Sequence, residues 1–352
     1  MRYLIWPLLI LLIVFRYFTT RPVYKNGDTV RITATVYSDP VNYPGSQGIK
    51  IGGLRFYLPV FPEISYGDRI IVEGTVDSGK LKNPKLISVT ESQGFGSGFR
   101  NKIISFYQTV LPQPMSGLIA GITLGSKGTL ASDFWQQIKN TGIVYMISAS
   151  GIKVTFLVSF LMGVLTFFLP RKKAIIIVII AIIMYLFISG FGASPVRAAV
   201  MAFLAFFGQE TGRLVSSWRI LFLTAGIMLA VQPDWLTDIG FALSFVSIAS
   251  IMLFNKRIER LLKFIPEVLK ESLSISLSAQ IGLSPILFVT FGQFNIWSPL
   301  INVLVLWTVP FVMILGSLGG VVGLMWPFLG RFILLVSYPL LWWFCKIVSV
   351  FS

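Results

Sequence analysis

Residues 143–170 form an apolar stretch that is long enough to enter a lipid bilayer but carries polar residues near its start. The stretch reads IVYMISASGIKVTFLVSFLMGVLTFFLP, and the interruption consists of Ser148, Ser150, Gly151 and Lys153. An unpaired polar group in hydrocarbon is expensive, so such an interruption is tolerated where the backbone is buried in protein or lines a water-filled cavity. The stretch therefore indicates that the chain builds a polar path across a membrane.

The composition supports an integral membrane protein. Of the 352 residues, 55% are hydrophobic and 12% are charged. The chain contains no histidine and a single cysteine, Cys345. These counts exclude a disulfide framework and the usual zinc, haem and iron–sulfur ligand sets, and they remove the commonest general base. We therefore expect no enzymatic activity, no metal site and no cofactor.

The formal net charge of +15 invites a nucleic-acid interpretation, but most of the excess sits where membrane topology places it. Apolar segments follow residue 170 at 174–191, 195–208, 217–231, 237–254, 271–292, 298–323 and 329–350. If each segment crosses once, the loops on one side collect Arg171, Lys172, Lys173, Arg213, Lys256, Arg257, Arg260, Lys263, Lys270 and Arg331. The positive-inside rule makes this side cytoplasmic, with the N-terminus inside, the C-terminus outside and about nine crossings.

The first 92 residues divide into a membrane helix and a β domain. Residues 1–21 are predicted to form an uncleaved membrane helix, because no small-residue cleavage site follows the apolar run. Residues 22–92 contain short alternating runs such as TVRITATVY and RIIVEGTV, separated by Gly, Pro, Asn and Asp turns. About four or five such strands favour a small OB-like domain, which the predicted topology places outside the cytoplasm.

The β domain offers candidate contacts to nucleic acid. OB-folds bind single strands through aromatic and basic side chains on one sheet face, and Arg31, Lys50, Arg55 and Tyr57 could serve this purpose. The alternative is that these residues are ordinary barrel and surface residues. That alternative is favoured because acidic and basic residues nearly balance in this region.

Residues 93–142 are predicted to be a linker followed by amphipathic helices at the membrane interface. The run FRNKIISFYQTVL places Arg100 and Lys102 on the expected wet side of one helix, and DFWQQIKNT predicts a second. Residues 143–352 then form a transmembrane channel domain. The expected fold is a polytopic α-helical membrane protein with a small extracytoplasmic all-β, OB-like domain near the N-terminus.

Arg197 and Asp238 stand out because each begins a helix on the side that the charge rule depletes. Arg197 follows Ser194-Pro195, and a cation in a first turn opposes the helix dipole. It therefore has either a role at a pore mouth or a side chain that reaches lipid headgroups. Asp238 favours a helix start on its own, although an Arg197–Asp238 pair is geometrically open.

Four further polar residues allow two interpretations each. Ser276 and Gln280 are four residues apart on one helix face, and Asn302 lies just inside the next helix. Such groups either join membrane helices or line a pore. Lys153 is either a phosphate contact beside half-helix ends or a group that reaches out to the interface.

Taken together, these pieces resemble the ComEC-type competence protein family. The resemblance rests on LGSKGTLASDFWQQIKNTGIVYMISASGIKVTFLVSF, SPVRAAVM, QPDWLTDIGFALSF, AQIGLSP and FGQFNIWSPLINVLVL, in this order and after the OB-like domain. By motif match it implies functional positions at Ser150, Gly151, Arg197, Asp238, Gly240, Phe241 and Ser244. The family usually has His where Lys153 stands. Many members also carry a C-terminal metallo-β-lactamase-like nuclease domain, and we do not expect that nuclease activity here.

The resemblance implies an inner-membrane channel that takes up single-stranded DNA during natural transformation. Because no phosphate-binding loop is present, we expect a passive conduit. The implied partners are single-stranded DNA, membrane lipids, an extracytoplasmic DNA receptor, a separate nuclease and a cytoplasmic ATPase motor, and a homo-oligomer stays open. The predicted DNA path comprises Ser148, Ser150, Gly151, Lys153, Arg197, Asp238, Gly240, Phe241, Ser244, Gln280 and Asn302. The alternatives are a transporter of another anionic polymer or solute and a non-transporting membrane scaffold.

Overall fold

A computed structural model of the protein describes most of the chain from residue 26 onward. The described residues are 12–13, 15–17, 19, 26–36, 40–43, 46–51, 53–59, 61–62, 64, 67–77, 79–90, 95–126, 128–143, 150–212, 216–263, 266–291 and 297–352. Most of the predicted first membrane helix, residues 1–21, lies outside them. Ser148 and the side chains of Lys50 and Ser150 also lie outside the described part.

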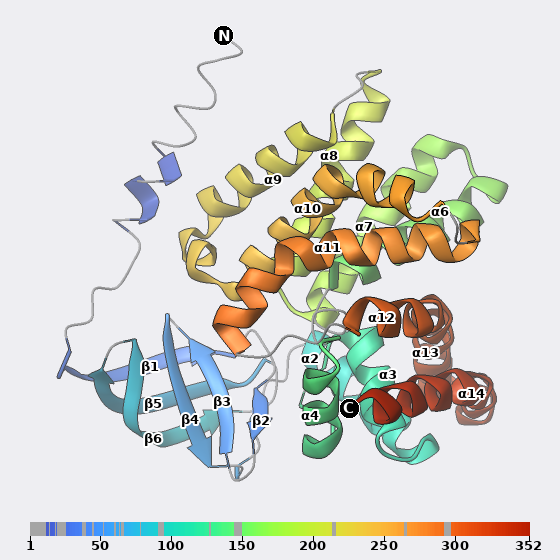
Figure 1. The fold of residues 1–352 in the computed structure, drawn as a ribbon. Coiled ribbons are helices and arrows are strands. Elements are labelled where there is room, and N and C mark those ends of the chain that lie inside the picture. Colours follow the sequence, from blue (N-terminus) through green and yellow to red (C-terminus); the bar gives the residue numbers. More distant parts are fainter. Residues whose placement is uncertain are drawn as a thin grey trace.

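A six-stranded sheet occupies the N-terminal end of the described chain (Figure 1). Its strands are β1 (Thr29–Thr35), β2 (Val41–Tyr43), β3 (Ser46–Ile51), β4 (Leu54–Pro59), β5 (Arg69–Asp77) and β6 (Lys80–Thr90). They lie in the order β1-β5-β6-β4-β3-β2, and β4 runs parallel to β6 while the other neighbours are antiparallel. The predicted small β domain is therefore confirmed, and this mixed, Greek-key-like order is OB-like with one additional short strand, β2.

Alternating side chains explain why this segment forms a sheet with one buried face. Along β4 every second residue is buried, with Leu54, Phe56 and Leu58 inside. Ile70 and Val72 of β5 join the same hydrophobic core. A period of two residues matches the pleat of a strand that has one face on a core and one face in solvent.

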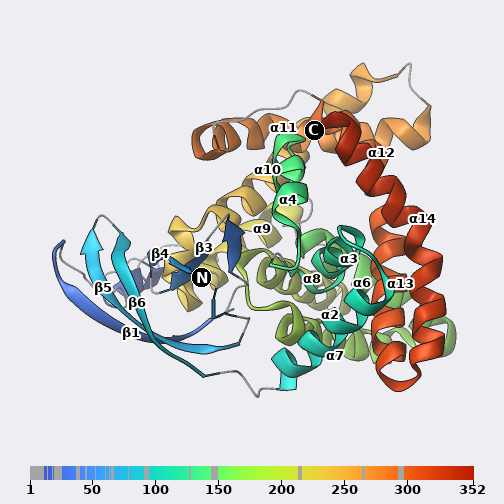
Figure 2. The ribbon, with the colours of Figure 1, turned by 90° about the horizontal axis from the view of Figure 1, so that it is seen from below.

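Helices make up most of the remaining described chain. They are α2 (Phe95–Val110), α3 (Met115–Leu124), α4 (Ser132–Asn140), α6 (Ser150–Phe168), α7 (Arg171–Ser189), α8 (Ala193–Glu210), α9 (Ser217–Val231), the 3-10 helix η1 (Pro233–Thr237), α10 (Ile239–Leu261), α11 (Glu267–Phe291), α12 (Ser298–Leu306), α13 (Thr308–Met325) and α14 (Pro327–Phe351). One core joins α2, α3, α4, α12, α13 and α14, which we call the packed group. Figure 2 shows α13 and α14 of this group side by side. Helices α6 to α11 form a second group, the cavity group, above it in Figure 1.

Five of the described helices are long and apolar enough to cross a membrane. They are α7, α10, α13, α14 and, within α11, Lys270–Val289. Their large apolar side chains are widely exposed, and Val289 reaches 85%. Such a surface suits lipid rather than water. The protein is thus a multi-pass membrane protein, as the sequence predicts.

One predicted crossing is divided in the structure. Residues 298–323 are expected to cross once, but α12 ends at Leu306 and α13 begins at Thr308. Pro310 supplies the physical reason, because proline has no N–H and its ring clashes with the carbonyl four residues earlier, here that of Leu306.

The expectation that Arg100 lies on a wet helix face is wrong. Its side chain is 2% exposed, and Nη1 donates to the carbonyl of Ile188 at 3.3 Å. Ile188 lies in the last turn of α7, where carbonyls lack helical partners and attract cations. Lys102 is exposed, as expected. The packing of α2 against α7 therefore buries Arg100 and leaves Lys102 exposed.

Candidate functional site

Helices α6, α8, α9, α10, α11 and α12 surround a cavity of about 600 Å³. Aliphatic side chains form most of its wall. The polar lining comprises Thr155, Ser159, Ser194, Arg197, Ser217, Ser244, Ser247, Ser276 and Asn302. A concave, mainly apolar space with a few placed polar groups is the usual form of a binding site in proteins.

Arg197 is the only charged residue in the lining of this cavity, within the described chain. Its side chain is 6% exposed. Nη1 lies 3.7 Å from Sδ of Met201, the guanidinium carbon lies 5.8 Å from the ring centre of Phe245, and Nε has no hydrogen-bond partner among the described residues. A guanidinium held by a thioether and an aromatic ring has no strong acceptor in the described part of the chain, and its Nε–H is left without a hydrogen bond.

Gly151 lets the Arg197 side chain approach the start of α6. A Cβ atom at residue 151 would overlap Nη2 of Arg197 and would lie 3.8 Å from Oγ of Ser194. Oγ of Ser244 donates to Oγ of Ser194 at 3.3 Å and so links α10 to α8. Helix α6 begins within the predicted polar interruption, so that interruption marks a helix start beside the cavity.

The start of α10 brings one predicted residue to the cavity and places two others elsewhere. Gly240 lines the cavity. Asp238 caps α10, because its Oδ1 accepts from the N–H of Phe241 at 3.0 Å, and the Phe241 ring is buried against Met228. Between these described residues no ion pair joins Arg197 to Asp238, so the pairing left open by the sequence is not formed.

Lys153 is not part of the cavity lining, which corrects its place in the predicted path. It is 2% exposed, and Nζ donates to the carbonyl of Gly121 at 2.5 Å. Gly121 lies in the last turn of α3, where carbonyls attract a cation. Residues two positions apart in an α-helix are about 200° apart around its axis. Lys153 therefore points away from the face of α6 that carries Gly151.

Of the polar residues on α11 and α12, Ser276 and Asn302 reach the cavity and Gln280 does not. Nδ2 of Asn302 donates to Oγ of Ser276 at 3.0 Å. Gln280 is buried outside the lining, because the cavity face of α11 continues through Ala279 and Leu283 instead. Gln280 therefore lies outside the cavity lining, whereas the hydrogen bond from Asn302 to Ser276 joins α12 to α11, which is the helix-joining interpretation of these polar residues.

The candidate contacts of the β domain occupy exposed positions on the sheet. Arg31, Arg55 and Tyr57 are exposed, and Tyr57 reaches 53%. Arg31 stands opposite Glu73 in the β1–β5 pair, where an opposite charge offsets its own. These positions are accessible to a ligand, and their role in binding nucleic acid stays a prediction.

Several lining residues are missed by the sequence reasoning, and a repeated spacing could have found them. Thr155 and Ser159 follow Gly151 at steps of four, and Ser247 follows Ser244 at three. Small and hydroxyl side chains at these steps share one helix face. The spacing identifies a face that is small and polar, but it does not say whether that face meets another helix or a cavity.

A multi-pass membrane protein whose helices, among them the candidate spans α10 and α11, surround a partly polar cavity with a buried cation belongs to a recognisable class, the multi-pass membrane proteins with an internal ligand-sized site. Comparison with known proteins then identifies the family. Residues 122–352 match the family model described as competence protein, so the chain belongs to the competence protein family.

A curated relative agrees with this assignment. The chain is 28% identical over 223 residues to ComE operon protein 3 of Bacillus subtilis (strain 168). The match covers 63% of this chain and 28% of that relative, so the chain spans little more than a quarter of the relative's length. No solved structure matches the chain.

Proposed function

We propose that the protein is a channel component that admits single-stranded DNA across the cell membrane during natural transformation. Its membership of the competence protein family supports this role. The single observation that carries it is the buried Arg197 in a cavity whose wall includes the candidate membrane spans α10 and α11. A buried cation within membrane helices is costly to keep and marks a path for ions or charged substrates.

The arrangement of charge along α10 supports a path that crosses the membrane. Gly240 lines the cavity at one end of this helix, and Lys256 and Arg260 lie near the other. Twenty residues of helix span about 30 Å, the thickness of the hydrocarbon core. A chain of phosphates that follows α10 would thus meet Arg197 of α8 at the cavity end and Lys256 and Arg260 at the other end.

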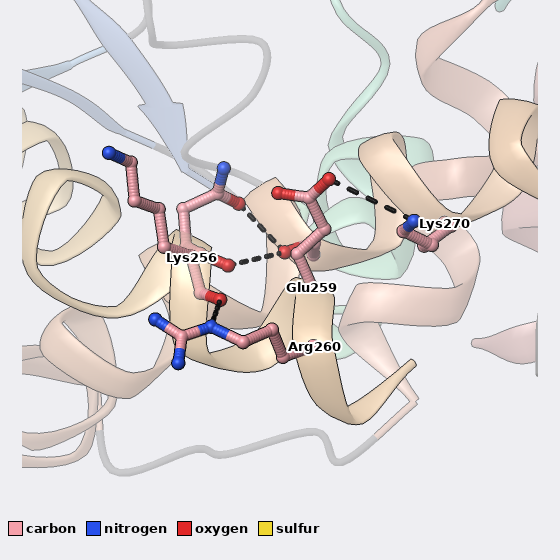
Figure 3. A network of polar contacts seen from close by, with 6 residues as sticks. Lys256, Glu259, Arg260 and Lys270 are labelled. Atoms are coloured by element: carbon pink, nitrogen blue, oxygen red, sulfur yellow. Dashed lines mark hydrogen bonds and ion pairs between the residues drawn. The ribbon is translucent and has the colours of Figure 1, made fainter. Parts of the chain in front are cut away.

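A basic cluster, which we define as Lys256, Arg260, Lys263 and Lys270, lies at the far end of α10 and the start of α11. Figure 3 shows Lys256, Arg260 and Lys270 of this cluster. Glu259 pairs with Lys270 at 3.9 Å, and Nε of Arg260 donates to the carbonyl of Lys256 at 3.2 Å. The excess positive charge places this end in the cytoplasm by the positive-inside rule. The β domain is then extracytoplasmic, as the sequence-based topology predicts.

The cavity volume favours one second candidate, a transporter of a small anionic solute. A space of about 600 Å³ lies within the range of small-molecule sites, and passage of a polymer requires α6, α8 and α10 to separate further. In the first proposal the DNA strand and its partners hold these helices apart. In the second, the cavity encloses the whole ligand.

Labelled-DNA uptake tests the proposal. Naturally competent cells that carry the gene, its deletion or Arg197→Met are given fluorescent duplex DNA, and protected intracellular label is counted beside the protein level. We expect entry to require the gene and Arg197, while the exposed control Lys102→Gln behaves like wild type. Normal DNA entry in the deletion strain would overturn the proposal.

A further inference from the structure

In the described part of the chain, Arg16, Arg100, Lys153 and Arg197 are buried or partly buried cations that lie at helix ends, and Arg197 differs from the other three. Nη1 of Arg16 donates to Ala230 at the end of α9, Arg100 donates to the end of α7, and Lys153 donates to the end of α3. These three lie at helix C-termini, where free carbonyls stabilise a cation. Arg197 lies instead among helix N-termini, where free N–H groups disfavour it.

Two helix N-termini reach the cavity next to the Arg197 guanidinium. Gly151 is the second residue of α6, and Ser194 is the second residue of α8. Both line the cavity, and the start of α8 has no side-chain cap. The first N–H groups of α6 and those of Ala193 and Ser194 in α8 have no partner within their helices, whereas Pro195 has no N–H and the N–H of Val196 donates to the carbonyl of Gly192. These N–H groups and the guanidinium are donors of the same sign at one place.

Side chains around this place add donors rather than a countercharge. Oγ of Ser194 and Oγ of Ser244 lie 3.3 Å apart at the same wall. Asp238 is the acid nearest along the chain to this wall, and its Oδ1 is engaged by the N–H of Phe241 outside the cavity lining. The Arg197 side chain is more than nine-tenths buried, and its Nε has no partner among the described residues. An uncompensated buried charge is strongly unfavourable, so an anion at this site would be stabilised.

We infer that Arg197, Ser194 and the first turns of α6 and α8 form a binding site for one phosphate group, here one phosphodiester of the DNA strand. This inference rests on the proposed function for the identity of the ligand. The planar guanidinium provides a two-donor fork for phosphate oxygens, and the helix starts provide backbone N–H groups. The site holds the strand by its backbone, so it does not select a base sequence.

Gly151 has a defined role in this site. Any side chain at residue 151 would occupy the space of the Arg197 guanidinium. The glycine therefore keeps the donors of α6 and the fork of Arg197 around one common point. The neighbouring aliphatic wall lowers the local dielectric constant, which strengthens the attraction between the phosphate and its donors.

Binding to the purified full chain in lipid nanodiscs tests the site. The probes are inorganic phosphate, with chloride at equal ionic strength as reference, a short oligothymidylate, and the same oligomer with uncharged methylphosphonate linkages. Wild type, Arg197→Gln, Arg197→Lys and the exposed control Lys102→Gln are compared by the shift in thermal unfolding. Arg197→Lys keeps the positive charge but lacks the planar fork, so it tests the site even if Arg197→Gln does not fold.

We expect phosphate and the phosphodiester oligomer to stabilise wild type and Lys102→Gln. Arg197→Gln should bind both about tenfold or more weakly, with Arg197→Lys in between, because a charged hydrogen-bonding group is lost or loses its fork. None of the four proteins should bind the methylphosphonate oligomer. Equal phosphate binding by wild type and Arg197→Gln, or no phosphate binding by wild type, would overturn the site. Binding of free phosphate without binding of the oligomer would overturn its assignment to DNA.

The result separates this inference from the proposed function. Normal DNA uptake by Arg197→Gln cells, together with lost phosphate binding in nanodiscs, leaves the site standing and removes it from the DNA path. Gene-dependent DNA uptake, together with phosphate binding that does not depend on Arg197, leaves the uptake function standing and overturns the site.

Discussion

The packed group and the cavity group use glycine for opposite purposes. In the packed group, a Cβ atom on Gly330 of α14 would overlap the backbone of Gly323 in α13, and one on Gly323 would overlap the ring of Phe106. These glycines bring helix axes together and leave no space. In the cavity group, Gly151 gives its space to the Arg197 guanidinium. A glycine in a membrane helix thus closes a contact in one region and keeps a polar site accessible in the other.

Buried cations show the same division. Lys153 donates to the carbonyl of Gly121 in α3, a helix of the packed group. Arg197 lines the cavity instead, and its Nε has no hydrogen-bond partner among the described residues. Both are nearly inaccessible to solvent, so burial alone does not distinguish a structural cation from a functional one. In our proposal, the helix terminus that each cation meets distinguishes them.

Gly323→Val should have the largest effect, because it breaks the packed group. The added side chain meets Phe106 and the α13–α14 contact, and overpacking of this kind costs about 1–3 kcal/mol or more. Membrane protein level, thermal unfolding in detergent and DNA uptake should fall together. Normal uptake at a normal protein level would show that the packed group tolerates separation.

Arg197→Met should come next, with an effect confined to function. We expect DNA uptake to fall on the order of tenfold to a hundredfold, because a buried charged donor to phosphate is lost. The protein level should stay at or above wild type, since removal of an unpaired buried charge does not destabilise the fold. Immunoblots beside uptake counts separate the two effects.

Gly151→Ala should give a smaller loss of the same kind. Alanine favours a helix over glycine by about 1 kcal/mol, so α6 should be at least as stable. Its Cβ displaces the Arg197 guanidinium, so phosphate binding and uptake should both weaken while thermal stability holds. A fall in thermal stability with unchanged phosphate binding would show that Gly151 serves helix packing, as Gly323 and Gly330 do.

Lys153→Met should have the smallest effect on uptake. Replacement of a buried ion by an apolar side chain of similar size is often close to neutral, and Lys153 faces away from the cavity lining. DNA uptake per molecule of protein should match wild type. A loss as large as that of Arg197→Met, at normal protein level, would remove the distinction between the two cations.

Patterns along the chain predict the membrane class, the β domain and the importance of Arg197. Each of these rests on a local property: apolar length, alternation in strands, or a cation in a first turn. The same patterns misplace Arg100 and Lys153. The pattern within one helix predicts which face carries each residue, but it does not predict what packs on that face. The partner comes from a distant segment, α7 for Arg100 and α3 for Lys153.

The sequence by itself determined that this chain enters a membrane several times, that a small sheet precedes the helices, and that its residues fit a competence protein. The first two follow from side-chain hydrophobicity and from the periods of helix and strand, which need no partner. The fit to a competence protein rests instead on the resemblance of its motifs, in their order, to those of the family. Only the tertiary structure decided which cation meets a cavity and which meets a carbonyl. The free energy of a buried charge depends on the groups packed around it, and those groups come from segments far apart in the chain.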